Sequence, residues 1–322
     1  ARVAGSAAGD RRAWMLRILF LLAVFAILRL AEMPFTVCRY LHYRAFDLTP
    51  LTPGGWVRIL LLGLPVPMAL FTLKYLLVLC SFAVFKQRWW LGSFLLIFLL
   101  FDVLPEVASR TYPLDPVEQL APLPAGSHAT AINEALARAG MSLPVMVVDQ
   151  AKRSNTSNLY IAGRRNREYV LITDTFLRQF TPGQAALAAA HELGHLRRRT
   201  ILLIADKTLS FLVLAAGFFL AFVIARRPLF RLSRGQIVLV VMLSLSAVSF
   251  ALQPVTNAFY RREELLADRY AVEIASDPKA YGRLLADMAK QNLEPLDMPV
   301  WEKTLFSSYP SVMERLRECE TR

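Results

Sequence analysis

The sequence predicts a mainly α-helical protein that crosses a membrane several times and carries one small β-sheet. The 322-residue chain is 55% hydrophobic and has a mean hydropathy of +0.40, whereas soluble domains contain roughly 45–50% apolar residues. Its apolar residues gather in blocks close to the roughly 20 residues that span a bilayer. The polar segments between the blocks carry helix-start signals and short alternating patterns typical of strands.

Five apolar stretches are the predicted membrane spans. They cover residues 13–31, 56–85, 89–104, 208–225 and 237–255. The last two contain no charged residue over 18 and 19 positions, so helices buried in a soluble core are the weaker interpretation. A signal peptide is the alternative for the first stretch, but no small-residue cleavage site follows it.

The spans and the polar segments divide the chain into four expected regions. These are an N-terminal membrane region with about three spans (1–104), a segment with a small sheet and a histidine-bearing helix (105–200), two spans joined by a basic hairpin (201–255), and a C-terminal helical segment (256–322). Within the second region we expect an extended proline-rich stretch (105–124) and three short strands (144–149, 157–163 and 168–174).

Charge and cysteine usage narrow the class of protein. The net charge of +12 comes largely from arginines that flank the apolar stretches, a pattern typical of membrane proteins rather than of nucleic-acid binding. The predicted loops on the two sides carry nearly equal positive charge, so this count assigns no orientation. Cys38, Cys80 and Cys319 are widely spaced and form neither a disulfide framework nor a metal pair.

The segment 181–200 predicts a helix with two histidines on one face. Residues 181–184, Thr-Pro-Gly-Gln, supply an N-cap, a first-turn proline and the glutamine of a capping box. His191 and His195 lie one turn apart on such a helix, so both imidazoles can bind a single metal ion. Glu192 is rotated away from that ion, where a carboxylate can take a proton from a metal-bound water.

A third ligand is expected from the acidic stretch that follows the last span. Zinc in enzymes commonly takes two imidazoles and a carboxylate and keeps one position open for water. In "RREELLADRYA", residues 261–271, Glu264 and Asp268 share one helix face. One of them can bind the metal while the other holds an imidazole through its second nitrogen. Glu263 is the competing ligand, and a solvated acidic face is the alternative for the whole stretch.

These motifs resemble those of the zinc metallopeptidases that include HtpX and the Ste-type CAAX prenyl endopeptidases. The resemblance covers roughly residues 130 to 320. It is carried by "TSNLYIAG", "AAHELGH", "PVTNAFYRREELLADRYA", "AKQNLEPL" and "SSYPSVMERL", and the prenyl-endopeptidase branch is the more similar. The resemblance implies a gluzincin-type zinc protease domain that contains the small sheet. It also implies a bacterial, multi-pass protein of the inner (cytoplasmic) membrane.

The resemblance also assigns a metal centre by position. It implies that His191, His195 and Glu264 bind one zinc ion per chain. Glu192 would be the general base, and Asp268 would hold a metal-binding imidazole through its second nitrogen.

Four further residues are assigned by the same resemblance. Asn158 and Tyr160 would lie on an edge strand that pairs with an extended peptide. Arg315 matches an arginine near the family's site. Tyr309 stands where the family has a histidine thought to stabilise the oxyanion, and its hydroxyl can donate the same kind of hydrogen bond. A packing role for Tyr309 is the alternative.

The expected function is an integral-membrane zinc endopeptidase that hydrolyses extended protein or peptide substrates, including membrane-embedded or lipidated ones. The lipid bilayer is its expected partner, and nucleic acid is not. A catalytically weak or inactive membrane scaffold is the alternative, which Tyr309 favours and the intact Glu192 opposes. A transporter is a weaker alternative, because the apolar stretches carry few charges near their centres.

Overall fold

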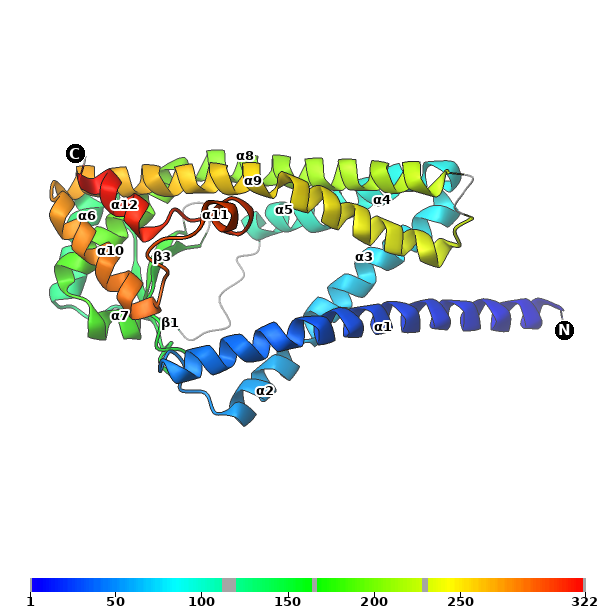
Figure 1. Cartoon of the computed structure of the whole chain (residues 1–322), viewed down its shortest axis with the longest axis horizontal. Coiled ribbons are helices and arrows are strands. Elements are labelled where there is room, and N and C mark those ends of the chain that lie inside the picture. Colours follow the sequence, from blue (N-terminus) through cyan, green and yellow to red (C-terminus); the bar gives the residue numbers. More distant parts are fainter. Residues whose placement is uncertain (1, 112–119, 164–166, 228–230, 321–322) are drawn as a thin grey trace. The chain divides into compact units, whose positions relative to one another are not determined.

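The computed structural model describes residues 2–111, 120–163, 167–227 and 231–320, and most of them are helical (Figure 1). The longer helices are α1 (Arg2–Ala45), α3 (Pro65–Val84), α8 (Pro182–Ala225), α9 (Arg234–Ala275) and α10 (Pro278–Asn292). The shorter helices are α2 (Pro53–Gly63), α4 (Trp89–Phe98), α5 (Leu104–Thr111), α6 (Ser127–Arg138), α7 (Asp174–Gln179), α11 (Val300–Phe306) and α12 (Val312–Glu320). A 3-10 turn, η1 (Lys86–Arg88), and a π-turn, η2 (Leu99–Val103), complete the helical elements. The prediction of a mainly helical fold is confirmed.

Five helical segments in the described residues are long and apolar enough to cross a membrane. They are Arg12–Ala45, Pro53–Val84, Lys86–Ala108, Pro182–Ala225 and Arg234–Ala275. The five predicted stretches correspond to them one to one, so the prediction of about five spans is confirmed. Helices α8 and α9 are 44 and 42 residues long. Each therefore continues without a break from an apolar stretch into the polar sequence that carries the motifs.

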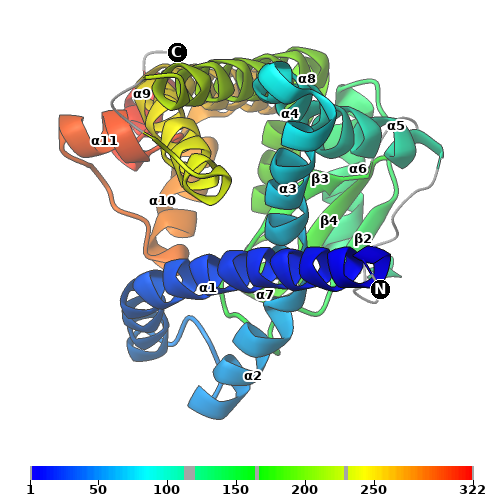
Figure 2. The same cartoon turned by 90° about the vertical axis from the view of Figure 1, so that its right-hand side faces the viewer.

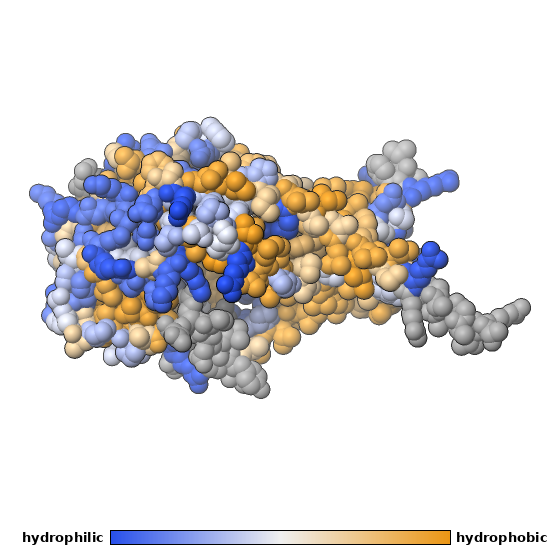
Figure 3. All heavy atoms as spheres, turned by 90° about the horizontal axis from the view of Figure 1, so that it is seen from below, coloured by the Kyte–Doolittle hydropathy of each residue, from blue (hydrophilic) through white to orange (hydrophobic). Residues whose placement is uncertain are grey.

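The chain forms two compact units. The membrane unit contains Ala1–Phe46, Leu51–Pro105 and Ser210–Ser249, and the sheet unit contains Asp47–Pro50, Glu106–Leu209 and Phe250–Arg322. Large apolar side chains of the membrane unit, such as Phe35 and Leu243, are more than 70% exposed. Hydrophobic side chains also dominate the surface around the candidate spans in Figure 3. Such a surface is suited to lipid rather than to water.

The sheet has four strands in the order β1-β2-β4-β3. They are β1 (Leu120–Pro122), β2 (Val145–Val148), β3 (Leu159–Ala162) and β4 (Tyr169–Thr173). Strands β2 and β4 are parallel and the other pairs are antiparallel, which leaves β3 at an edge. The three predicted strands overlap β2, β3 and β4. The extended stretch expected over 105–124 is wrong for its first part, where α5 reaches Thr111 and Pro105 lies two residues after the end of the π-turn η2. Residues 112–119 lie outside the described residues.

One face of the sheet packs against α6, α7 and α8. The register places Leu159, Val170 and Ile172 on the same face, and all three belong to the main buried cluster. That cluster also contains Ile132 and Leu136 of α6, Phe176 of α7, and Ala189, Ala190 and Leu193 of α8. Figure 2 shows α6 beside these strands. The small alanines let α8 approach the sheet closely, which holds the histidine-bearing helix beside β3.

Candidate metal and active site

A glycine at the crossing of α8 and α9 brings the two motif-bearing segments together. A Cβ atom added to Gly194 would lie 2.8 Å from the Cα atom of Ala267, closer than side chains ordinarily approach a backbone. Gly194 lies between the two histidines of "HELGH", and Ala267 lies between Glu264 and Asp268. The close crossing therefore places the imidazoles of one helix opposite the carboxylates of the other.

Three ligand atoms meet at this crossing. The Nε2 atoms of His191 and His195 are 3.1 Å apart. The Glu264 carboxylate lies 3.5 Å from His191 Nε2 and 3.4 Å from His195 Nε2. Among the described residues, these three form the group whose donor atoms all lie within 4.8 Å of one another. Of the two carboxylates that the sequence left open on this face, Glu264 is the one in this group.

The dimensions and chemistry of the group fit a catalytic zinc ion. Ligands at about 2.0–2.1 Å from a tetrahedral zinc lie about 3.3 Å from one another, close to the distances found between the three donors. Two unprotonated imidazole nitrogens 3.1 Å apart would direct their lone pairs at each other, an arrangement that a shared cation stabilises. Two histidines and one carboxylate also leave a fourth position open, as in zinc hydrolases.

A buried polar network lies behind His191. Its Nδ1 atom is 2.9 Å from both Asp268 Oδ1 and the Tyr281 hydroxyl. The Tyr281 hydroxyl donates to Asp268 Oδ1 at 2.6 Å, and Arg315 donates to both oxygens of the same carboxylate at 2.6 and 2.8 Å. A proton on Nδ1 leaves the Nε2 lone pair of His191 free to face the metal position.

The surroundings of Tyr281 and Arg315 keep both side chains protonated. Burial raises the pKa of the Tyr281 hydroxyl well above its usual range, and the charge of Asp268 adds to the shift, so the hydroxyl stays a donor. Burial opposes the charge on Arg315, but the Asp268 carboxylate outweighs it and raises the pKa of the guanidinium well above its usual range. Asp268, only 1% exposed, is thus held by a fixed cation and a fixed hydroxyl donor.

Tyr281 is a site residue that sequence reasoning missed. It lies on α10, outside both motifs, and nothing in its local sequence distinguishes it from a core tyrosine. Arg315, which the resemblance placed near the site, donates to both oxygens of Asp268. Tyr281 thus contacts the ligand His191 directly, and Arg315 is linked to it through Asp268.

Glu263 does not compete for the metal position. It is 3% exposed and receives two hydrogen bonds from the Arg198 guanidinium, at 2.5 and 2.8 Å. This bidentate pair occupies both of its oxygens. The neighbouring glutamates therefore have different partners, Glu263 an arginine and Glu264 the two histidines.

Glu192 faces the edge strand β3. The backbone N–H of Ile161 donates to Glu192 Oε2 over 3.4 Å, which places the carboxylate between the imidazoles and the strand. The ladder pairs Asn158 with Thr173, since the Thr173 N–H donates to the Asn158 carbonyl. Because paired and outward-facing residues alternate along an antiparallel strand, the N–H and C=O groups of Leu159 and Ile161 point to the open edge.

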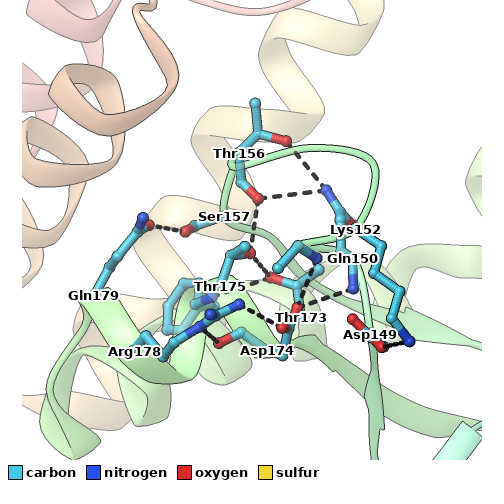
Figure 4. Close-up of polar contacts among 12 residues, drawn as sticks. Asp149, Gln150, Lys152, Thr156, Ser157, Thr173, Asp174, Thr175, Arg178 and Gln179 are labelled. Atoms are coloured by element: carbon cyan, nitrogen blue, oxygen red, sulfur yellow. Dashed lines mark hydrogen bonds and ion pairs between the residues drawn. The ribbon is translucent and has the colours of Figure 1, made fainter. Parts of the chain in front are cut away.

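The start of β3 is anchored by a polar network (Figure 4). The Thr156 carbonyl accepts hydrogen bonds from Thr175 Oγ1 at 2.8 Å and Gln150 Nε2 at 3.3 Å. Two residues further along, the Thr173 hydroxyl donates to the Asn158 carbonyl and accepts from the Asn158 N–H. The backbone that leads into the edge strand is therefore held in one position before the strand begins.

The end of β3 is anchored to the histidine-bearing helix. Arg199 of α8 donates to the carbonyl of Gly163 at 3.0 Å and to Glu168 Oε1 at 2.6 Å. Gly163 has a φ of +83°, and a Cβ atom there would lie 2.1 Å from the Arg167 carbonyl oxygen, so only glycine fits. The same helix thus carries the histidines and fixes the far end of β3.

Tyr309 lies in the loop between α11 and α12 and is 58% exposed. Partial burial raises the pKa of its hydroxyl, and the charges of Glu264 and Glu192 raise it further. The hydroxyl therefore stays protonated near the two carboxylates. Arg261 holds this loop by donating to the Ser307 carbonyl at 2.6 Å.

This fold and site define a class of protein: a membrane-spanning metallopeptidase with a His-His-Glu centre. The model of "Peptidase family M48" matches residues 122–322. The chain therefore belongs to peptidase family M48 and is a zinc-dependent hydrolase acting on peptide bonds, as the sequence motifs predict.

Individual relatives agree with this assignment. The chain is 25% identical over 316 residues to the uncharacterized metalloprotease YhfN of Bacillus subtilis (strain 168), covering 94% of this chain and 72% of that protein. It is 27% identical over 241 residues to a CAAX prenyl protease 1 homolog of Arabidopsis thaliana, covering 71% of this chain and 54% of that protein. The crystal structure of S. mikatae Ste24p has a similar fold, with a TM-score of 0.75 and 20% identity over 94% of this chain and 75% of that one.

Proposed function

We propose that the His191–His195–Glu264 group is the catalytic zinc site of this membrane endopeptidase, with Glu192 as its general base. One observation carries the proposal. Three donor atoms lie within 4.8 Å of one another, and the Glu192 carboxylate lies beside them, facing an edge strand. A metal position, a base and a place for an extended peptide thus occur together.

The proposed chemistry divides between the metal and the chain. A zinc ion held there would supply Lewis acidity and would lower the pKa of a bound water to about 7. Glu192 accepts the proton of the attacking water and passes it to the amine nitrogen that leaves when the peptide bond breaks. Its position between the imidazoles and β3 lets one carboxylate reach both the water and the peptide.

Residues around the centre position its groups. Asp268, Tyr281 and Arg315 hold the proton on His191 Nδ1 and so fix the ring with its Nε2 atom toward the metal position. We assign Arg315 a positioning role because it reaches the centre through Asp268. The Tyr309 hydroxyl is the proposed donor to the oxyanion, since it stays protonated and lies near Glu192 and Glu264.

The substrate is proposed to bind as an added strand along β3, whose residues Asn158 and Tyr160 border the site. The outward N–H of Leu159 and the outward C=O groups of Leu159 and Ile161 offer backbone hydrogen bonds to an extended peptide of any sequence, while the Ile161 N–H already donates to Glu192. Extended, membrane-proximal and lipidated peptides all fit this mode, and two relatives are named as CAAX prenyl proteases. A bacterial inner-membrane location fits the relatives from Bacillus and Streptomyces.

The test separates metal binding from catalysis. Purified full-length protein should contain about one zinc per chain and should cleave an unfolded protein substrate such as casein, with activity lost on chelation. Glu192→Gln should keep the zinc but lower kcat by about 10²- to 10⁴-fold, the contribution typical of a general base. His195→Ala should lose the zinc itself.

Two outcomes would contradict the proposal. If zinc remains bound after His195→Ala, the assignment of the three metal ligands is wrong. If the wild-type chain binds its full zinc but, like Glu192→Gln, cleaves no peptide, the protein is the inactive membrane scaffold instead.

A further inference from the structure

Helix α11 carries exposed apolar side chains outside the site already described. Val300, Trp301 and Phe306 are 74%, 62% and 65% exposed, although the helix has only seven residues. The rings of Trp301 and Phe306 meet edge to face with centroids 6.3 Å apart. The basic residue of the helix, Lys303, forms an ion pair with Glu314 of α12. The most exposed side chains of α11 are therefore aromatic and aliphatic, which is unusual for a surface that faces water.

Buried polar side chains of α9 hold α11 in place. Asn257, 2% exposed, donates to the Thr304 carbonyl at 3.0 Å. Arg261 donates to the carbonyls of Lys303 and Ser307 at 2.8 and 2.6 Å. These bonds lie at both the middle and the end of α11, which lies crosswise to α9 in Figures 1 and 2. The position of α11 along α9 is therefore fixed.

The attachment points lie directly after an apolar span. The predicted span 237–255 of α9 ends at Val255, and the first charged residue after it is Arg261. Asn257 and Arg261 follow it by two and six positions, or about 3 and 9 Å at the rise of an α-helix. The headgroup layer on each side of a bilayer is roughly 5–8 Å thick. If the hydrocarbon region ends near Val255, the Asn257 attachment lies at the level of the lipid headgroups and the Arg261 attachment lies at their outer edge.

We infer that α11 is a membrane-interface helix whose exposed Trp301 and Phe306 rings insert into the headgroup layer of the lipid bilayer. Tryptophan is enriched at this depth, because one part of its ring is apolar and its N–H is polar. The exposed Arg262 next to the attachment points suits anionic headgroups. The inference rests on the membrane spans and not on the catalytic roles proposed above. It places the loop that begins at Ser307 and carries Tyr309 at the membrane surface.

Depth-dependent fluorescence quenching tests this inference. The full chain is reconstituted in phosphatidylcholine–phosphatidylglycerol vesicles whose acyl chains carry bromine either near the headgroup or near the chain end. The difference between wild type and Trp301→Phe isolates the emission of Trp301 from that of the other four tryptophans. We expect shallow bromine to quench this emission at least about twofold more than deep bromine or aqueous iodide, since quenching by bromine requires contact.

Other quenching patterns overturn the inference. Strong quenching by iodide with none by bromolipid would mean that α11 faces water. Protection from both quenchers would mean that protein covers the helix. An independent probe is a spin label on Trp301→Cys in a Cys38→Ser, Cys80→Ser background. A membrane-interface position requires stronger relaxation by lipid-soluble oxygen than that of a label on an exposed residue of α7 such as Arg178→Cys.

Discussion

Helices α8 and α9 approach each other closely in both units, each time at a glycine, and the two contacts differ in what surrounds them. In the sheet unit, a Cβ atom on Gly194 would meet the backbone of Ala267 at 2.8 Å, and donors of the metal centre lie on both sides. In the membrane unit, a Cβ atom on Gly217 would meet first the flexible end of Leu245, at 2.5 Å, with its Cα atom at 3.0 Å. Apolar side chains surround this second contact.

The two units also differ in how they use polar groups. In the described part of the membrane unit, Ser210 of α8 donates to Asp102 at 2.6 Å, while the buried hydroxyls of Ser93 and Ser244 have no hydrogen-bond partner. In the sheet unit, the buried carboxylates Glu263 and Asp268 are each held by an arginine. The contact between α8 and α9 therefore stabilises the membrane unit by apolar packing, whereas in the sheet unit it positions charged groups.

The largest expected effect comes from the two glycines. Gly194→Ala should force α8 and α9 apart against a rigid backbone, at a cost of about 1–3 kcal/mol. Metal sites tolerate ligand shifts of only about 0.2 Å, so zinc affinity should fall at least about tenfold and activity should fall with it. Zinc titration and peptide hydrolysis measure both quantities.

Gly217→Ala is the matched variant of the membrane unit. It should lower thermal stability but leave zinc affinity unchanged, because Leu245 can move its side chain and no ligand lies near. Gly183→Ala controls for the added methyl group on the same helix, since nothing lies within 4 Å of its Cβ position. Equal loss of zinc in the Gly194 and Gly217 variants would show that the crossings do not differ as argued.

The next effect concerns the network behind His191. Tyr281→Phe removes the hydroxyl that lies 2.9 Å from His191 Nδ1 and 2.6 Å from Asp268. Loss of such a supporting group typically weakens metal binding about 10- to 100-fold. Because Asp268 still accepts from His191 Nδ1, we expect the lower end of this range, and a competition titration with a chelator would measure it. Tyr270→Phe, on α9 under the Arg197 guanidinium, should leave zinc affinity unchanged; a similar loss there would point to general destabilisation.

A smaller effect is expected at Tyr309. Removing an oxyanion donor costs about 10²- to 10³-fold in kcat at a buried site, but this side chain is 58% exposed, and water can replace part of the bond. We expect Tyr309→Phe to lower kcat about tenfold, with KM and zinc content unchanged. An unchanged kcat would favour the packing role that the sequence left open.

The sequence predicted those site residues whose spacing is itself informative. His191 and His195, like Glu264 and Asp268, are four positions apart on helices, so their faces follow from helix geometry alone. Spacing also disfavoured Glu263, which is five positions from Asp268 and so lies on a different face, but its partner Arg198 lies on the other helix and could not be predicted from spacing. Tyr281 was missed for the same reason. Its partners come from α8 and α9, and only tertiary packing brings them together.

The smallest effect concerns the end of β3, where Arg199 binds the Gly163 carbonyl and Glu168. Arg199→Gln should loosen the edge strand without moving the metal ligands, because the crossing at Gly194 is unaffected. The KM for an extended peptide should therefore rise about fivefold, equivalent to about 1 kcal/mol for a lost hydrogen bond, while zinc affinity stays constant. Arg197→Gln, on an exposed face of the same helix, is the control for lost charge. If the paired variant Arg199→Glu, Glu168→Arg restores KM, the ion pair itself holds the strand. If Arg199→Gln lowers zinc affinity as well, the strand and the metal centre form a single rigid structure. In that case the two functions of α8, which are to carry the metal ligands and to hold β3, cannot be separated.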